Sequence, residues 1–76
     1  NYTATEENYI KAIYHLQHAH EKVSTTLLSD EMNTRPASVT DMLKKLESKK
    51  MLHYQKYKGF SLTEHGNKTA LSVIRK

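Results

Sequence analysis

The sequence has 76 residues, no cysteine and a formal net charge of +4. At this length we expect residues 1–76 to form one small domain, and the missing thiols exclude a disulfide framework and a cysteine-based zinc site. No apolar run approaches the length of a membrane span, and the N-terminus lacks the charged-then-apolar order of a signal peptide. We therefore expect a cytoplasmic protein.

The charges are distributed unevenly along the chain. Residues 1–33 contain two lysines against five acidic residues, whereas residues 34–76 contain ten Lys and Arg against three acidic residues. A basic half joined to an acidic half is typical of a protein that places one side on phosphates. A merely solvated lysine-rich surface would have the same composition, so charge alone leaves both interpretations open.

The first predicted helix begins after Thr3, because Thr3 and Glu6 have the spacing of a capping box. Glu6 and Glu7 are interpreted as favourable charges near the positive end of that helix. The helix should end between His18 and His20, and we interpret these histidines as exposed rather than metal-binding, since no carboxylate or thiolate joins them at ligand spacing. Its apolar stripe is Tyr9, Ile10, Ile13 and Leu16, continued by Gln17.

A second, short helix is predicted from about Thr25 to Met32. Val23 should pack inward, and Ser24 or Thr25 should cap the helix. Asn33 follows the last apolar residue and tolerates the left-handed conformation that ends a helix. A three- or four-residue turn then leads to a third helix, which is the spacing of a helix-turn-helix.

The third predicted helix begins at Pro36, whose fixed φ suits the first turn of a helix. It should end near Lys49 and Lys50, although no glycine marks that end. Its core-facing stripe is Val39, Met42, Leu43 and Leu46. The remaining faces are polar and basic, so one side of this helix packs and the other is free for a partner.

Two partly alternating runs, residues 51–57 and 60–63, predict an antiparallel hairpin with its turn at Lys58 and Gly59. Thr63 or Glu64 should open a last helix, in which Gly66 costs little because it lies in the first turn. The predicted core-facing stripe of that helix is Asn67, Ala70, Leu71 and Ile74. The fold class is therefore mainly α (α+β): a winged helix-turn-helix with three helices, a two-stranded wing and a C-terminal helix.

In such a fold the start of the third helix meets base edges. Arg35 suits a guanine or a phosphate, and Asp41 is either an acceptor for a cytosine amine or only a surface carboxylate near the helix N-terminus. Lysines and a tyrosine hydroxyl suit phosphates. The candidate DNA-binding residues are Thr34, Arg35, Pro36, Ala37, Ser38, Thr40, Asp41, Lys44, Lys45, Lys56, Tyr57 and Lys58.

No phosphate-binding loop, nucleophile motif or carboxylate pair with a base is present, so the sequence does not predict an enzyme. A winged helix can also serve as a protein-interaction module, in which the third helix and the hairpin meet a protein. The two functions differ in salt dependence, because counterion release weakens DNA binding steeply as salt rises.

Three segments resemble the N-terminal DNA-binding domain of the diphtheria toxin repressor family, the iron- or manganese-dependent transcriptional regulators. They are ENYIKAIYHL from Glu7, RPASVTDMLKKLE from Arg35 and YQKYKGFSLTEHG from Tyr54. The most specific parts are SVT-x-M-x-x-x-L in the third helix and Y-K-G-x-x-L-T in the wing. The resemblance covers nearly the whole chain.

This resemblance implies a homodimer that binds a palindromic DNA operator when Fe²⁺ or Mn²⁺ is bound and represses metal-uptake genes. Relatives continue into a metal-binding and dimerisation domain, which is absent from this chain. The manganese branch has an Asp at the place of Asn8 and a Glu at the place of Lys11. An amide is a weak ligand and a charged lysine is none, so Asn8 is only a weak metal candidate, and we expect no stably bound metal in this chain.

Overall fold

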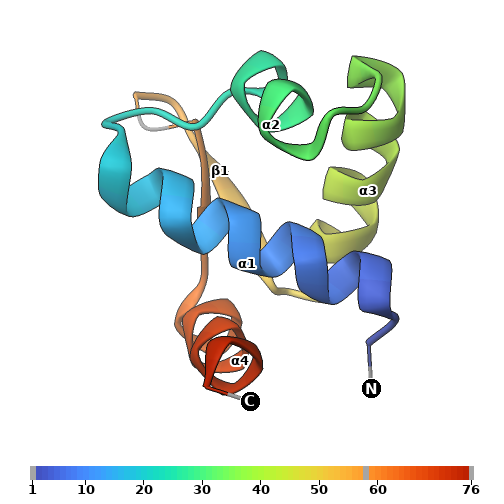
Figure 1. The fold of residues 1–76 in the computed structure, drawn as a ribbon. Helices are drawn as coiled ribbons and strands as arrows, with labels where there is room; N and C mark the ends of the chain where they lie inside the picture. Colours follow the sequence, from blue (N-terminus) through green and yellow to red (C-terminus); the bar gives the residue numbers. More distant parts are fainter. Residues whose placement is uncertain (1, 58, 76) are drawn as a thin grey trace.

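The computed structural model describes residues 2–57 and 59–75. The elements are α1 (Ala4–Ala19), α2 (Thr25–Met32), α3 (Pro36–Ser48), β1 (Leu52–Gln55), β2 (Gly59–Leu62) and α4 (Glu64–Ile74). In Figure 1, α1 crosses the middle of the molecule, with α2 and α3 on one side and α4 on the other. The predicted winged helix-turn-helix is confirmed. None of the helices in the described ranges has the length and apolar character needed to cross a membrane.

Short polar side chains begin three of the helices, as predicted. The capping box of α1 is complete: the Glu6 N–H donates to Thr3 Oγ1 at 3.1 Å, and the Thr3 N–H donates to Glu6 Oε1 at 2.9 Å. Ser24 caps α2, and Thr63 caps α4. Pro36 opens α3, as its fixed φ favours.

Left-handed residues end α2 and α3. Asn33 has φ 53°, as predicted, and lets the Thr34 N–H bond to Ser29 O at 3.0 Å. Lys50 has φ 62°, and beyond it the Met51 N–H donates to Leu46 O at 3.0 Å. This pattern is a Schellman ending, which normally uses glycine and here places a lysine in a conformation that most residues avoid.

The core lies between α1 and the elements around it. Its buried side chains include the predicted stripes of α1 and α3, except that Met42 is only half-buried. The predicted stripe of α4 is wrong at its end, because Ile74 is 36% exposed and Leu71 is half-buried. The first two turns of α4 supply its buried residues, Gly66 and Ala70, and the last turn lies at the margin of the core.

The hairpin pairs Leu52 with Leu62 and Tyr54 with Phe60 in antiparallel register. Its first strand is shorter than predicted, since residues 56 and 57 already belong to the turn, and Gly59, which was predicted in the turn, begins β2. Its second strand is also bonded on the other edge, where the Phe60 N–H donates to Val23 O at 2.9 Å. The wing is therefore tied to the segment that leads into α2.

Two glycines allow close backbone approaches that a side chain would block. A Cβ at Gly59, where φ is +71°, would collide with the carbonyl of Val23, and a Cβ at Gly66 would collide with the carbonyl of Met51. The sequence predicts only a small cost in helix propensity at Gly66. Its role in the structure is to let the first turn of α4 lie directly on the backbone after α3.

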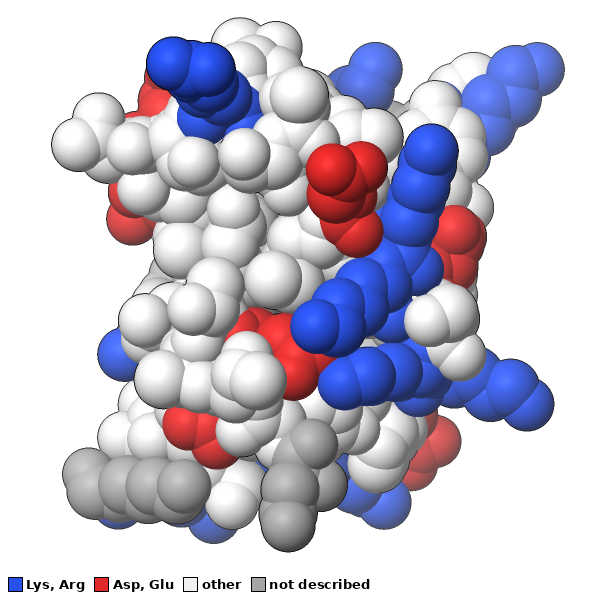
Figure 2. Space-filling view, turned by 90° about the vertical axis from the view of Figure 1, so that its right-hand side faces the viewer, with Lys and Arg blue, Asp and Glu red and all other residues white. Residues whose placement is uncertain are grey.

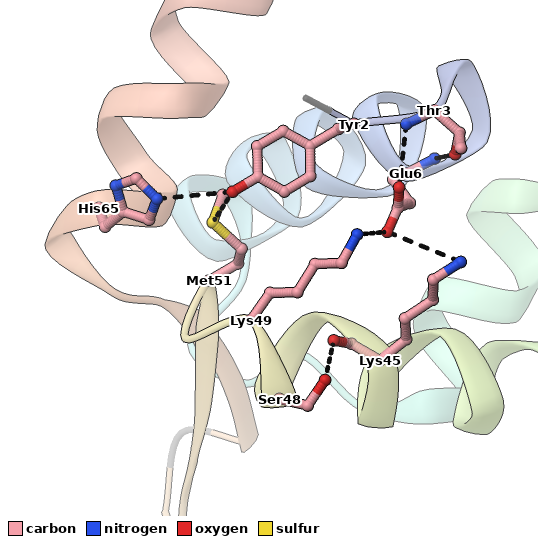
Figure 3. A network of polar contacts seen from close by, with 8 residues as sticks. All are labelled: Tyr2, Thr3, Glu6, Lys45, Ser48, Lys49, Met51 and His65. Carbon is pink, nitrogen blue, oxygen red and sulfur yellow. Dashed lines mark hydrogen bonds and ion pairs between the residues drawn. The ribbon is translucent and has the colours of Figure 1, made fainter.

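A buried carboxylate joins α1 to α3 (Figure 3). Glu6 is 1% exposed, and its Oε2 accepts a hydrogen bond from Lys49 Nζ at 2.6 Å and lies 3.8 Å from Lys45 Nζ. The interpretation of Glu6 as a surface charge at a helix start is therefore incomplete, because its partners lie about forty residues later in the chain.

Tyr2 adds a second connection beside this ion pair (Figure 3). Its hydroxyl donates to Met51 Sδ at 3.0 Å and lies 3.5 Å from His65 Nε2, and its ring centroid is 5.2 Å from Lys49 Nζ. The segment before α1 thus contacts the loop after α3 and the beginning of α4, and it lies next to the paired lysine.

The hydrogen bond from Lys49, with smaller contributions from the Thr3 N–H and the lysine charges, lowers the pKa of Glu6 from 4.5 to about 2, although burial opposes the shift. A carboxyl group whose pKa is lower in the folded state stabilises the fold above its unfolded pKa and loses that contribution as pH falls toward the folded value.

Glu6 should therefore lose its stabilising effect between about pH 4.5 and pH 2. Denaturant unfolding of wild type and Glu6→Gln at pH 5 and pH 2 should show a difference in free energy that shrinks at pH 2; a constant difference would contradict this.

Gly66→Ala should destabilise the fold by about 1–3 kcal/mol, because the new methyl group must displace the backbone at Met51. The matched control is Ser72→Ala in the same helix at an exposed position, which should change stability by less than about 0.5 kcal/mol. Urea unfolding of both variants followed by circular dichroism measures the difference. Equal stabilities would show that α4 does not need this close approach.

Candidate nucleic-acid interface

The start of α3 is bare. All residues from 34 to 38 are exposed, and Arg35 stands at the N-cap position without a side-chain capping bond. In the described part of the chain no acidic side chain forms an ion pair with Arg35. Its guanidinium therefore remains available for a guanine edge or a phosphate, as the sequence predicts.

An open hollow of about 700 Å³ lies at the turn between α2 and α3. Its walls are hydroxyl, amide and charged side chains from both helices: Ser29, Asp30, Asn33, Thr34, Arg35 and Ser38. The structure therefore brings Thr34, Arg35 and Ser38 of the predicted set together on one surface. Pro36 and Ala37 are exposed beside them, in reach of an apolar group such as a thymine methyl.

Further exposed residues of α3 are Thr40, Asp41, Lys44 and Lys45. The Thr40 hydroxyl donates to Pro36 O at 3.0 Å, so its proton is used within the helix and its oxygen remains an acceptor. Asp41 is exposed in the second turn of α3, whereas the helix dipole favours a carboxylate mainly in the first turn. The structure therefore gives little support to the dipole interpretation, and the contact of Asp41 with a cytosine amine stays a prediction.

The hairpin lies beside this helix. A groove of about 260 Å³ separates them, lined by Thr25, Thr40, Leu43, Lys44, Glu47, Tyr54 and Phe60. Tyr54 and Phe60 meet edge to face across the two strands, with ring centroids 5.3 Å apart, and Tyr54 is 57% exposed. The place of Tyr54 in this groove could not be predicted from the sequence, because alternation within a strand shows that a residue faces outward but not which helix it faces.

Lys44 and Lys45 are neighbours in sequence but point to different sides of α3. Lys44 lines the groove next to the hairpin, whereas Lys45 lies 3.8 Å from Glu6 on the side of α1 and remains 53% exposed. Figure 2 views the molecule from the right-hand side of Figure 1, and on this face Lys and Arg side chains gather on one half, with acidic side chains between them. The predicted basic surface is thus interrupted by carboxylates.

The wing tip carries Lys56 and Tyr57, both exposed. Lys56 Nζ lies 5.6 Å from the centroid of the Tyr57 ring, and Tyr57 is 82% exposed. Both side chains are therefore available to a partner. Lys58, the third predicted residue at this tip, lies outside the described residues.

The metal ligands expected from the resemblance do not fit this chain. Asn8 is exposed on α1, and Lys11, one turn later, offers an ammonium group rather than an oxygen. Within residues 2–57 and 59–75, no group of three or more His, Cys, Asp or Glu side chains is placed to hold a metal ion. The ring of His18 is engaged with Tyr14, since its Nδ1 lies 2.8 Å from Tyr14 O.

The chain is similar to known transcriptional regulators. It is 36% identical over 72 residues to the HTH-type transcriptional regulator MntR of Oceanobacillus iheyensis, covering 95% of this chain and 49% of that protein. It is 32% identical over 74 residues to the regulator MntR of Listeria monocytogenes serotype 4b (strain F2365), covering 97% of this chain and 52% of that protein. The chain therefore spans about half the length of these relatives.

Two solved structures have the same fold. The structure of ScaR with bound Zn²⁺ matches with a TM-score of 0.85 at 31% identity, over 92% of this chain and 32% of that one. The manganese regulator SloR matches with a TM-score of 0.83 at 34% identity, over 93% of this chain and 33% of that one.

The family comparison agrees with these relatives and with the resemblance drawn from the three sequence segments. Residues 1–60 match the model of the iron dependent repressor, N-terminal DNA binding domain. The exposed start of α3, the adjacent wing and the matched residues lead to one conclusion: the chain belongs to the iron dependent repressor family and corresponds to its N-terminal DNA-binding domain.

Proposed function

We propose that residues 1–76 form the sequence-specific DNA-binding domain of an iron- or manganese-dependent transcriptional repressor that controls metal-uptake genes. The observation that carries this proposal is the exposed N-terminal end of α3, where Arg35 forms no ion pair among the described residues, in a chain of this family. The domain acts by binding rather than by catalysis, and the protein works in the cytoplasm.

In this proposal the two parts of the surface have different roles. The residues around the first turn of α3 read base edges in the major groove: Thr34, Arg35, Pro36, Ala37, Ser38, Thr40 and Asp41. Lys44, on the hairpin side of the helix, and the wing residues Lys56, Tyr57 and Lys58 bind phosphates, which supply affinity without sequence choice. Lys45 stays a candidate for the phosphate-binding set, at its edge nearest Glu6.

The longer protein is proposed to be a homodimer on a palindromic operator, with Fe²⁺ or Mn²⁺ bound outside this chain. The structural neighbour described as a manganese regulator and the neighbour with bound Zn²⁺ support a divalent metal. The groups around Asn8 do not supply a site for it. A protein-interaction module is the competing function, and the family match favours DNA.

Arg35→Ala should weaken binding to the preferred duplex by about 1–3 kcal/mol and relax base preference at one position, because a base contact is lost. The duplex is obtained by selection from a randomised library with the wild-type chain, and affinities are measured by fluorescence anisotropy on selected and random duplexes. Equal losses on both would contradict the base-reading role of Arg35.

Lys56→Ala should weaken binding to all sequences alike and reduce the slope of log K against log salt by about one unit, because one phosphate contact is lost. The same result is expected for Lys58→Ala. Lys68→Ala in α4 is the matched control; its side chain pairs with Glu64, and it should leave the slope unchanged. Salt-insensitive binding of the wild-type chain to duplex DNA would instead support a protein-interaction module.

A further inference from the structure

Glu6 is the one buried carboxylate among the described residues, and nothing in the proposed DNA contacts uses it. It is also more than a helix cap. One of its oxygens accepts the Thr3 N–H, as the capping box requires, while the other faces α3 and meets two lysines. The capping role is thus satisfied by one oxygen, and the second oxygen needs its own explanation.

The two lysines lie one helical turn apart on the side of α3 next to its DNA-facing surface. The side chain of Lys49 is 36% exposed, and its Nζ lies 2.6 Å from Glu6 Oε2. The side chain of Lys45 is 53% exposed, and its Nζ lies 3.8 Å from the same oxygen. Figure 3 shows both side chains extending from α3 toward the same carboxylate. Lys45 follows Asp41 by one turn, so this pair of cations borders the exposed face of α3.

Releasing Lys49 to a phosphate would leave the Glu6 carboxylate buried without its main partner. Losing this partner is unfavourable because the Glu6 carboxylate is 1% exposed, whereas an exposed phosphate contact is weakened by solvent screening. Lys49 should therefore stay with Glu6 when a duplex approaches. Lys45 is attracted to the same carboxylate but remains exposed. It can therefore still contact a phosphate, but the attraction of Glu6 opposes that contact.

We propose that Glu6 is a specificity-determining residue: it holds Lys49, and partly Lys45, away from DNA phosphates and so limits sequence-independent affinity. This inference rests on the proposed function. Each additional phosphate contact steepens the salt dependence by about 0.9 unit and raises affinity for every sequence alike. Withholding one or two such contacts lowers binding to random DNA without changing the base-reading end of α3.

The first test compares Glu6→Gln with Glu64→Gln on a random-sequence duplex. Both substitutions remove one negative charge that pairs with a lysine, but Glu64 is an exposed residue of α4 whose partner is Lys68. Glu6→Gln should steepen the salt slope by about one to two units, and Glu64→Gln should leave it unchanged. The double variant Glu6→Gln/Lys49→Gln should have a salt slope close to that of the wild type, because the released lysine is removed. Equal slopes for Glu6→Gln and wild type, with a folded circular dichroism spectrum, would overturn the proposal.

The second test does not require the Glu6 variant to fold. Lys49→Gln leaves Glu6 its Thr3 and Lys45 partners and should keep the wild-type salt slope, whereas Lys44→Gln should reduce the slope by about one unit. If Lys49→Gln reduces the slope as much as Lys44→Gln does, Lys49 contacts phosphate and the proposal is wrong. Failure of the wild-type chain to bind duplex DNA would reject the proposed function itself, which separates the two failures.

Discussion

The structure depends on the burial of one stripe of α3 in the common core, where the helix contacts α2 and β1. Val39, Leu43 and Leu46 are almost completely buried, and they fix the rotation of the helix about its own axis. Because the side chains of a helix are set at fixed angles, this rotation also decides which residues face solvent. The exposed first turn, the groove beside the hairpin and the contact with Glu6 all follow from it. Packing, rather than any single polar contact, therefore positions the proposed reading surface.

Local signals in the sequence predicted most of the fold, because the caps, Pro36, Asn33 and the alternating strands act within a few residues. The sequence could not reveal long-range partners. Glu6 fits a capping box so well that its second role was hidden, since that role depends on Lys49, which lies 43 positions away. The position of Ile74 was wrong for a related reason: periodicity continues to the end of a helix, whereas the core does not.

The arrangement of the candidate DNA-binding residues could be predicted only in part, and their contacts with DNA stay a prediction. Thr34, Arg35 and Ser38 line one hollow, as their common place in the sequence suggested. The adjacent lysines 44 and 45 were grouped together, but successive residues on a helix point about 100° apart, and here they border different neighbours. A short basic run in a helix is therefore a poor guide to how many cations share a surface. The interactions of Lys45 and Lys49 with Glu6 show that carboxylates elsewhere in the chain also influence that number.

The hydrogen bond between Phe60 and Val23 limits the lengths that the connection between α1 and α2 can have in this fold. It bonds the wing to the connection between α1 and α2, and Gly59 keeps the two backbones close enough for it to form. An insertion in that connection would shift the hairpin relative to α3, even though the inserted residues lie far from both in sequence. The position of the wing therefore depends on the length of a connection that belongs to neither the hairpin nor α3.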